Sequence, residues 1–454
     1  MKVCYRRRVM VEKRPSRRAL LVGLGAVLAA SALPGAVEAR GRGVYGGRLA
    51  FRVPWSLTRL DPHDVTSFAA ALFAPACFDT LFARDEAGAI VPSLAEHEPE
   101  VSGADVVVTV REGLKSARSR PVGAKEAAAS LSRARAAGLG GFLADVAPPR
   151  VEGNRLRFSS KDPGKIAKAL ASPLAAIVPF GFTPDAPDGT GPFRATFRGG
   201  QLVLARNPLA ARGPAYLDEI VVSRADDLKA SLRAFETAAD DLGWLGMGLY
   251  EPRPGAKPFD AGALGYVGFF VGRDAGSWDA PGIAQRVCDS IPPARLAGFS
   301  LGAPWTVDSS DGWGGPSGPL LVRDDSPYLV ELARAVAGVL SRPDHELTVK
   351  PVPAEELAQK RASRMFCVAL DVVRPVAAGA LGAMLGLVQA ADAGRARELG
   401  LHPPKLGEVP VRSLTRTLRV GVLGELRAQG GRMPDVVLPN GALEWGAVRR
   451  ARRA

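Results

Sequence analysis

Two neighbouring stretches of turn-forming residues near the middle of the chain constrain its fold more than any other feature. Residues 188–193 read DGTGPF, and residues 206–220 read RNPLAARGPAYLDEI. Gly189 and Gly191 are expected to adopt backbone angles that other residues avoid, and Pro192 fixes its own φ and keeps the neighbouring chain extended. The first stretch therefore predicts a rigid turn that returns the chain to a sheet at a fixed angle. It is scaffold and carries no obvious catalytic group.

The second stretch repeats the same device further along the chain. Gly213 and Pro214 are expected to turn the chain, and the apolar residues Leu217 and Ile220 are expected to be buried in the strand that follows. Either stretch alone fits many α/β proteins. The two stretches together, in this order, fit far fewer proteins.

The first 39 residues have the composition of an export leader. A basic start precedes an apolar run at residues 19–33, and small residues follow before a predicted cleavage site after Ala39. The apolar run is about 15 residues long, shorter than the roughly 20 that a membrane-spanning helix needs. Residues 16–21, SRRALL, resemble a twin-arginine motif, so both the general and the twin-arginine export routes remain open. Met10 is an alternative start.

Charge and composition favour an exported globular protein over a nucleic-acid-binding one. The chain has 454 residues, enough for two or three domains, with 23% charged and 47% hydrophobic residues. Its formal net charge is +13, of which the leader contributes +6, leaving about +7 on the mature chain. Lys and Arg are spread along that chain without the concentrated basic face that nucleic-acid binding requires.

The cysteines and histidines point to no metal site. Cys4 leaves with the leader, and Cys77, Cys288 and Cys367 lie far apart with no CxxC spacing, so buried free thiols are expected over a disulfide. No lipidation box ends the leader. The four histidines are equally scattered, and neither a metal nor another cofactor is predicted.

Strand and helix patterns alternate along the chain and predict an α/β fold with mixed sheets. Residues 105–110 and 263–272 read as strands, and residues 123–138 read as an alanine-rich helix. Residues 376–399 read as one Ala/Gly-rich helix. Its uncharged part, residues 376–391, is too short to span a membrane, which favours a core helix.

In this order the motifs resemble the large solute-binding proteins of bacterial ABC importers, the peptide/nickel-binding family (family 5). LAFRVPWSLTRLDPHD is similar to the family's first strand and Leu-Asp-Pro loop, and CFDTLFARDEAGAIVPSLAE to the segment after it. The turn DGTGPF, followed by Arg-Asn-Pro, Gly-x-Pro and Leu-Asp-Glu-Ile, is the strongest match. The likeness extends from about residue 47 to 295. It departs at Gly123, where the family has a Ser/Thr helix cap, and at Leu209-Ala210, where it has Tyr-Trp.

The resemblance implies a two-lobed periplasmic binding protein fold with an inserted subdomain in the first lobe. The first lobe would comprise residues 40–75, 175–240 and 412–454, with the subdomain at residues 76–174. The second lobe would comprise residues 241–411. The implied function is capture of a peptide-like or other small solute by lobe closure, in a periplasmic monomer without a membrane span. The implied partner is an ABC transporter membrane permease.

A two-lobed binder places aromatic and polar groups on loops that face its cleft. On this basis the candidate ligand-binding residues are Trp55, Ser56, Trp244, Tyr250, Phe269, Trp305 and Trp313. Trp55 and Trp305 are preferred because turn-forming residues flank both. No catalytic residue is assigned to this function.

Two other functions remain open. The departures from the family pattern, and an atypical second lobe, fit a relative that acts as a sensor or structural partner without transport. Residues 298–302, GFSLG, also match the nucleophile elbow of a secreted serine hydrolase that would use Ser300, with Asp311 and His345 as partners. Pro304 would end the helix that the elbow requires, which argues against this alternative.

Overall fold

The computed structural model describes residues 45–85, 87–244, 255–299, 301–302, 312–404, 411–438 and 444–451. The predicted leader, its cleavage site after Ala39 and the alternative start at Met10 lie outside these residues. The described residues belong to one compact unit, Val44–Ala454.

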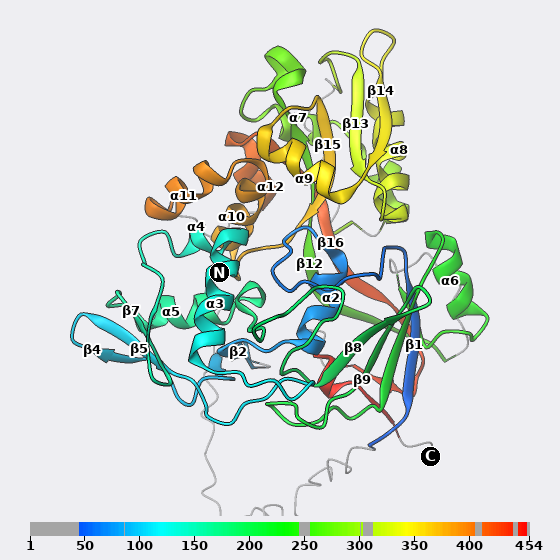
Figure 1. Ribbon diagram of the computed structural model, residues 1–454. Helices are drawn as coiled ribbons and strands as arrows, with labels where there is room; N and C mark the ends of the chain where they lie inside the picture. Colours follow the sequence, from blue (N-terminus) through cyan, green and yellow to red (C-terminus); the bar gives the residue numbers. More distant parts are fainter. Residues whose placement is uncertain are drawn as a thin grey trace, which may run out of the picture. The chain divides into compact units, whose positions relative to one another are not determined.

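A ten-stranded mixed sheet runs through this unit (Figure 1). In spatial order its strands are β14 (Leu347–Val352), β13 (Gly318–Arg323), β15 (Val368–Val373), β12 (Lys257–Val271), β16 (Val420–Arg432), β11 (Leu242–Trp244), β1 (Arg48–Val53), β10 (Glu219–Arg224), β9 (Gln201–Arg206) and β8 (Phe193–Arg198). Strand β1 is parallel to β10 and β11, and β13 is parallel to β14 and β15, whereas the remaining pairs are antiparallel. The predicted α/β class with mixed sheets is confirmed.

The two longest strands, β12 and β16, lie in the middle of this order and pair with each other from Lys257 to Phe270. Register shifts interrupt the pairing between Asp260 and Gly268, so the two strands form an irregular ribbon. We call β1 and β8–β11 the first-lobe strands and β13–β15 the second-lobe strands. The β12–β16 ribbon joins the two sets, as a two-lobed binding protein requires.

A smaller four-stranded sheet lies within residues 76–174, the range predicted for an inserted subdomain. Its order is β4 (Glu100–Ser102), β5 (Asp105–Thr109), β7 (Arg155–Phe158) and β6 (Arg150–Glu152). Helices α3 (Ala124–Ala134) and α5 (Pro163–Leu170) contribute to a core that this region forms for itself. A two-stranded hairpin, β2 (Phe82–Arg84) and β3 (Ile90–Pro92), precedes the sheet. At Gly123 the α3 N-terminus has no side-chain cap, and Glu126 instead accepts a hydrogen bond from the Gly123 N–H at 2.9 Å.

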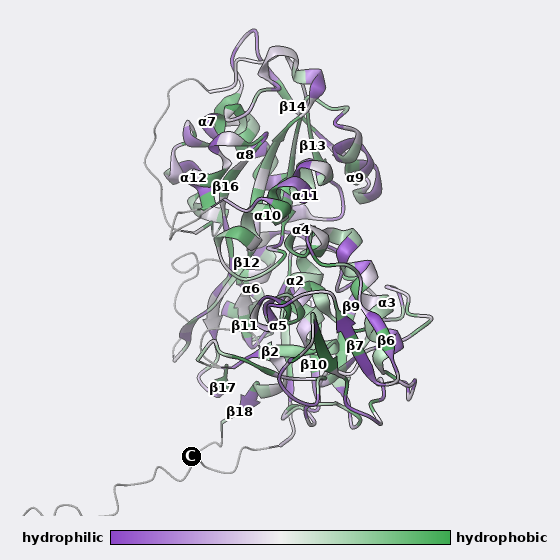
Figure 2. Cartoon of the chain, turned by 90° about the vertical axis from the view of Figure 1, so that its left-hand side faces the viewer, coloured by the Kyte–Doolittle hydropathy of each residue, from purple (hydrophilic) through white to green (hydrophobic). Residues whose placement is uncertain are grey.

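Among the described residues, the α-helices that follow β12 are α7 (Ile283–Asp289), α8 (Pro327–Leu340), α9 (Ala354–Ser363), α10 (Ala380–Ala391), α11 (Ala393–Leu401) and α12 (Val411–Leu414). Figure 2 shows that α9 is largely hydrophilic, whereas every residue of β15 is buried. The single helix predicted for residues 376–399 is wrong in detail, because Asp392 ends α10 and caps α11 with its carboxylate. Helix α10 is mostly buried, and among the described residues no helix has the length and apolarity needed to cross a membrane.

The DGTGPF turn is held against the end of helix α2 (Phe68–Cys77). The Gly191 N–H donates to the Cys77 carbonyl at 3.0 Å, and the Thr190 hydroxyl donates to Asp79 at 2.8 Å. Neither Gly189 nor Gly191 has a positive φ, so the expectation of unusual backbone angles there is wrong. Glycine is required for space, because a Cβ on Gly189 would lie 2.2 Å from the Cys77 oxygen.

The second stretch behaves as predicted. Gly213 has a φ of +97°, in the region that favours glycine, and it turns the chain before Pro214. Leu217 and Ile220 are fully buried in the core on the first-lobe side. The two stretches are therefore scaffold, as the sequence indicated.

The folded protein is expected to lose stability as the pH falls from about 6.5 towards 4. Burial and the nearby Arg133 lower the pKa of His63 from 6.5 to about 4, against the opposing effect of Asp61. Between these pH values the unfolded chain binds a proton that the folded protein excludes, so His63 stabilises the fold above pH 6.5 and progressively less below it. The loss attributable to His63 should reach roughly 3 kcal/mol near pH 4. Urea unfolding of the wild type and a His63→Gln variant at pH 7 and 4.5 measures it, and an identical pH slope for both proteins would contradict it.

The three described cysteines are expected to resist thiol reagents in the native protein. Cys77, Cys288 and Cys367 are free and buried, and burial raises the pKa of the Cys288 thiol to about 12 and that of Cys367 to about 11. Because thiolates are the reactive form, all three should react only after unfolding. A thiol titration of the mature protein with and without urea tests this. Rapid labelling of any of them in the native state would show that the packing is looser than described.

Candidate functional site

The loop after β1 carries the first two predicted ligand-binding residues to the junction with the second lobe. Trp55 is buried and stacks on Phe68, with ring centroids 5.1 Å apart. The Ser56 N–H donates to the Asp325 carbonyl at 2.9 Å, which ties this loop to the segment after β13. Both residues line a pocket of about 30 Å³, room for roughly two water molecules.

The other predicted residues lie elsewhere or outside the described part of the chain. Phe269 is buried in the core on β12, and Trp313 is buried with its Nε1–H donating to the Pro316 carbonyl at 3.1 Å. Trp244 belongs to β11, but its side chain is not among those that the structure describes. Tyr250 and Trp305 lie outside the described residues altogether. Ligand contact by these seven residues stays a prediction.

The alternative hydrolase site cannot be assembled from the described residues. Ser300 and Asp311 lie outside them. The remaining partner, His345, has its Nδ1 2.6 Å from the Gly315 carbonyl, in a local contact beside β14.

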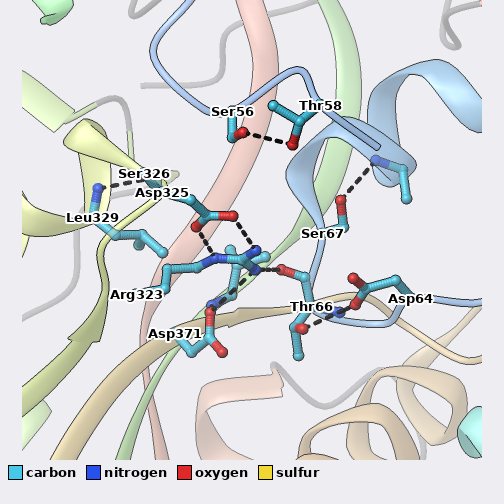
Figure 3. A network of polar contacts seen from close by, with 12 residues as sticks. Ser56, Thr58, Asp64, Thr66, Ser67, Arg323, Asp325, Ser326, Leu329 and Asp371 are labelled. Carbon is cyan, nitrogen blue, oxygen red and sulfur yellow. Dashed lines mark hydrogen bonds and ion pairs between the residues drawn. The ribbon is translucent and has the colours of Figure 1, made fainter. Parts of the chain in front are cut away.

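A polar network centred on Arg323 joins the two lobes beside the small pocket (Figure 3). The Arg323 guanidinium pairs through two nitrogens with Asp325 and donates from Nη1 to the Thr66 carbonyl at 2.7 Å. The same Nη1 lies 4.0 Å from Asp371, a fully buried carboxylate in the middle of β15. Although burial opposes the charged form, Asp325 and Asp371 raise the pKa of Arg323 above its usual value. Arg323 therefore stays a cation that connects β13 to the loop after β1.

Arg374, directly after β15, makes a second set of contacts across the same junction. Its backbone N–H donates to the Val65 carbonyl at 2.8 Å, and its Nη1 donates to the carbonyls of Pro62 and Asp64 at 3.2 and 3.1 Å. Burial lowers the pKa of Arg374 to about 10, so it too remains charged at neutral pH. Of these two arginines, only Arg323 lines the small pocket together with Trp55 and Ser56.

A larger cavity of about 480 Å³ lies close to this network and is lined from both lobes. The first-lobe side contributes Val65, Thr66 and Ala137. The second-lobe side contributes Arg273, the C-terminal end of α9 at residues 361–364, and the junction of α10 and α11 at residues 389–394. Thr66 connects the Arg323 network to the larger cavity, because its backbone carbonyl accepts a hydrogen bond from Arg323 and the residue also lines the cavity.

Arg361 connects this cavity to the buried carboxylate of Asp371. Its Nη2 lies 3.2 Å from Asp371, and its guanidinium lies over the Phe270 ring at 5.4 Å. Burial raises the pKa of Asp371, and the charges of Arg361 and Arg323 oppose that shift. The sequence interpretation missed Arg361, Arg323 and Arg374. One available indication was Asp371, a carboxylate inside the apolar run VALDVV, which requires a buried cation.

No protein-family model matches the sequence, and no curated protein matches it by sequence. Solved structures do match the fold. The oligopeptide-binding protein AppA from Bacillus subtilis, in complex with a nonapeptide, is 14% identical with a TM-score of 0.66, over 90% of this chain and 100% of that chain. The binding protein AgaA from A. tumefaciens, in complex with agropinic acid, is 15% identical with a TM-score of 0.68, over 90% and 99%.

A third match is OppA from Haemophilus influenzae, in complex with the peptide RPPGFSPFR. It is 11% identical with a TM-score of 0.67, over 90% of this chain and 100% of that chain. Because the matches extend over nearly the whole length of both chains, they include the ribbon and both sets of sheet strands. The protein therefore has the two-lobed fold of the peptide/nickel-binding solute-binding proteins, as the sequence resemblance predicted.

Proposed function

We propose that this protein is the extracytoplasmic solute-binding component of an ABC transporter, which captures a small solute between its lobes and delivers it to a membrane permease. The observation that carries the proposal is the cavity of about 480 Å³, lined by the loop after β1 on one side and by α9–α11 on the other. Small-molecule sites typically have volumes of roughly 300–1,000 Å³. The predicted export leader and the periplasmic location named for solved neighbours such as DppA from Helicobacter pylori support this compartment.

The proposed mechanism is closure of the lobes about the β12–β16 ribbon. A solute that contacts Thr66 and the end of α9 at once touches both lobes, and it favours the closed state only through contacts that the open state lacks. Shifting a mostly open protein to mostly closed requires about 5.5 kcal/mol of such preference. The closed form, as a monomer, would then dock on the permease.

The size of the cavity favours a compact solute over a long peptide. The neighbours' ligands include a nonapeptide and agropinic acid. About 480 Å³ accommodates a molecule of the second size, whereas an extended nonapeptide would require the lobes to separate further. We therefore propose that the cavity binds a small solute: an opine-like molecule, an amino-acid-like molecule or a short peptide.

A second function is favoured by the polar network itself. Arg323 and Arg374 already connect the lobes through the carbonyls of Pro62, Asp64 and Thr66. Such contacts would suit a relative that holds one conformation and acts as a sensor or structural partner without transport. The two functions differ in one respect: a transport component closes its lobes when a solute binds, whereas a structural or sensor relative of this kind would keep one conformation.

Isothermal titration calorimetry with agropinic acid, the peptide STSA and Ni(L-His)₂, solutes bound by solved neighbours, tests the proposal. We expect saturable one-to-one binding of at least one solute. An Ala362→Trp variant should abolish binding, because Ala362 lines the cavity. The matched control is Gln359→Trp, an exposed position on the same helix that does not line the cavity. If the two variants bound the solute equally well, the solute would bind elsewhere and this cavity would not be its site.

A further inference from the structure

The guanidinium of Arg361 is buried without a full set of hydrogen-bond partners. Its side chain is 6% exposed, and Nη2 is directed to Asp371. Nε and Nη1 have no hydrogen-bond partner among the described residues. Leaving buried N–H groups of a cation unpaired is costly, and structures normally pair them.

Both nitrogens are buried in this structure, so a solute in the cavity would reach and satisfy them as the lobes close around it. Arg361 lines the cavity between the lobes, and its guanidinium carbon lies over the Phe270 ring, 5.4 Å from the centroid. A planar guanidinium binds an oxyanion through parallel N–H groups, which a lysine or a neutral side chain cannot reproduce. The Asp371 contact occupies one terminal nitrogen and holds the group in place.

The other charges that line the cavity also favour an anion. Arg273 and Arg364 line it together with Arg361, against the single carboxylate of Asp392. That carboxylate is committed to the start of α11, where it accepts a hydrogen bond from the Arg395 N–H at 3.0 Å. Arg364 is paired with Asp279, but Asp279 also lies 3.1 Å from Arg419, so one carboxylate serves two cations.

We propose that the solute of this cavity carries an oxyanion, a carboxylate or a phosphate, which binds the buried guanidinium of Arg361. This inference rests on the proposed function and narrows its solute class to anions. Neutral and cationic solutes are disfavoured because they leave the arginine unsatisfied or add a like charge beside it. Arg361 is then the residue that determines specificity, and Asp371 positions it.

Titration of the full mature protein with charge-matched probes tests the assignment. The probes are agropinic acid, succinate and inorganic phosphate as anions, succinamide as the neutral counterpart of succinate, and putrescine as a cation. Arg361→Gln alone leaves Asp371 short of a counter-charge, so the test uses the double variant Arg361→Gln/Asp371→Asn, which removes both charges together. Arg361→Lys retains the charge without the planar fork. Circular dichroism establishes that each variant is folded.

Saturable binding of an anion by the wild type, with no binding of succinamide or putrescine, is the expected result. Affinity should fall at least about tenfold in the double variant and partly recover in Arg361→Lys. Succinate and phosphate separate carboxylate from phosphate recognition. Binding of succinamide or putrescine that the Ala362→Trp variant abolishes would overturn the anion assignment and leave the proposed function standing. Unchanged anion affinity in the double variant would have the same consequence. Absence of binding by every probe, with no small molecule retained by the purified protein, would overturn both.

Discussion

Replacing Gly191 by alanine is expected to destabilise the protein by about 3 kcal/mol, at the upper end of the cost of overpacking. A Cβ at this position would lie 2.5 Å from the Cys77 carbonyl carbon, 2.8 Å from the Phe78 nitrogen and 2.9 Å from the Ala76 oxygen. All three are backbone atoms, which cannot move aside as a flexible side chain can. Chemical denaturation measures the change in the free energy of unfolding.

The matched control for this change is Gly338→Ala. Gly338 is exposed within helix α8, and a Cβ there would meet nothing within 4 Å. Alanine should stabilise the helix by about 0.5–1 kcal/mol, because it loses less backbone entropy on folding. If the two substitutions changed stability alike, the close approach of the turn to α2 would be wrong.

Removing the charge of Asp371 is the second substitution with a large expected effect. Asp371→Asn should destabilise the protein by about 3 kcal/mol, because Arg361 and Arg323 would keep their charges in the interior without this carboxylate. The double variant Arg361→Gln/Asp371→Asn should be more stable than the sum of the two single changes by at least about 1 kcal/mol.

A double-mutant cycle in urea measures this coupling free energy. The wild type, both single variants and the double variant are compared under one set of conditions. Strict additivity would show that the pair does not interact, and the account of Arg361 as a group held in place by Asp371 would fail.

The sequence predicted the fold well where rigid local chemistry determines it. The turn at Gly213 and the buried residues Leu217 and Ile220 followed from residue type alone. The need for glycine at Gly189 and Gly191 was also clear, but its cause was not. The clash with Cys77 and Phe78 involves residues more than a hundred positions away, and one sequence does not reveal such a contact.

The candidate site was harder to predict because it is formed by ion pairs between residues of different helices and strands. Trp55 and Ser56 lie on the loop after β1 and line the smaller pocket, and their contact with a ligand stays a prediction. The larger cavity depends on Arg361, an arginine near the end of a hydrophilic helix whose pattern indicates a solvent-facing side chain. Only its pairing with Asp371 across two elements makes it buried, and helical periodicity carries no information about that partner.

Native mass spectrometry of the mature protein, purified gently from the cells that produce it, tests the central claim most directly. The account predicts a population heavier than the polypeptide by one small anionic molecule, which denaturation releases and which the Ala362→Trp variant lacks. A spectrum that shows only the polypeptide mass, for a protein that also gives no saturable isotherm with any probe, would contradict solute capture between the lobes.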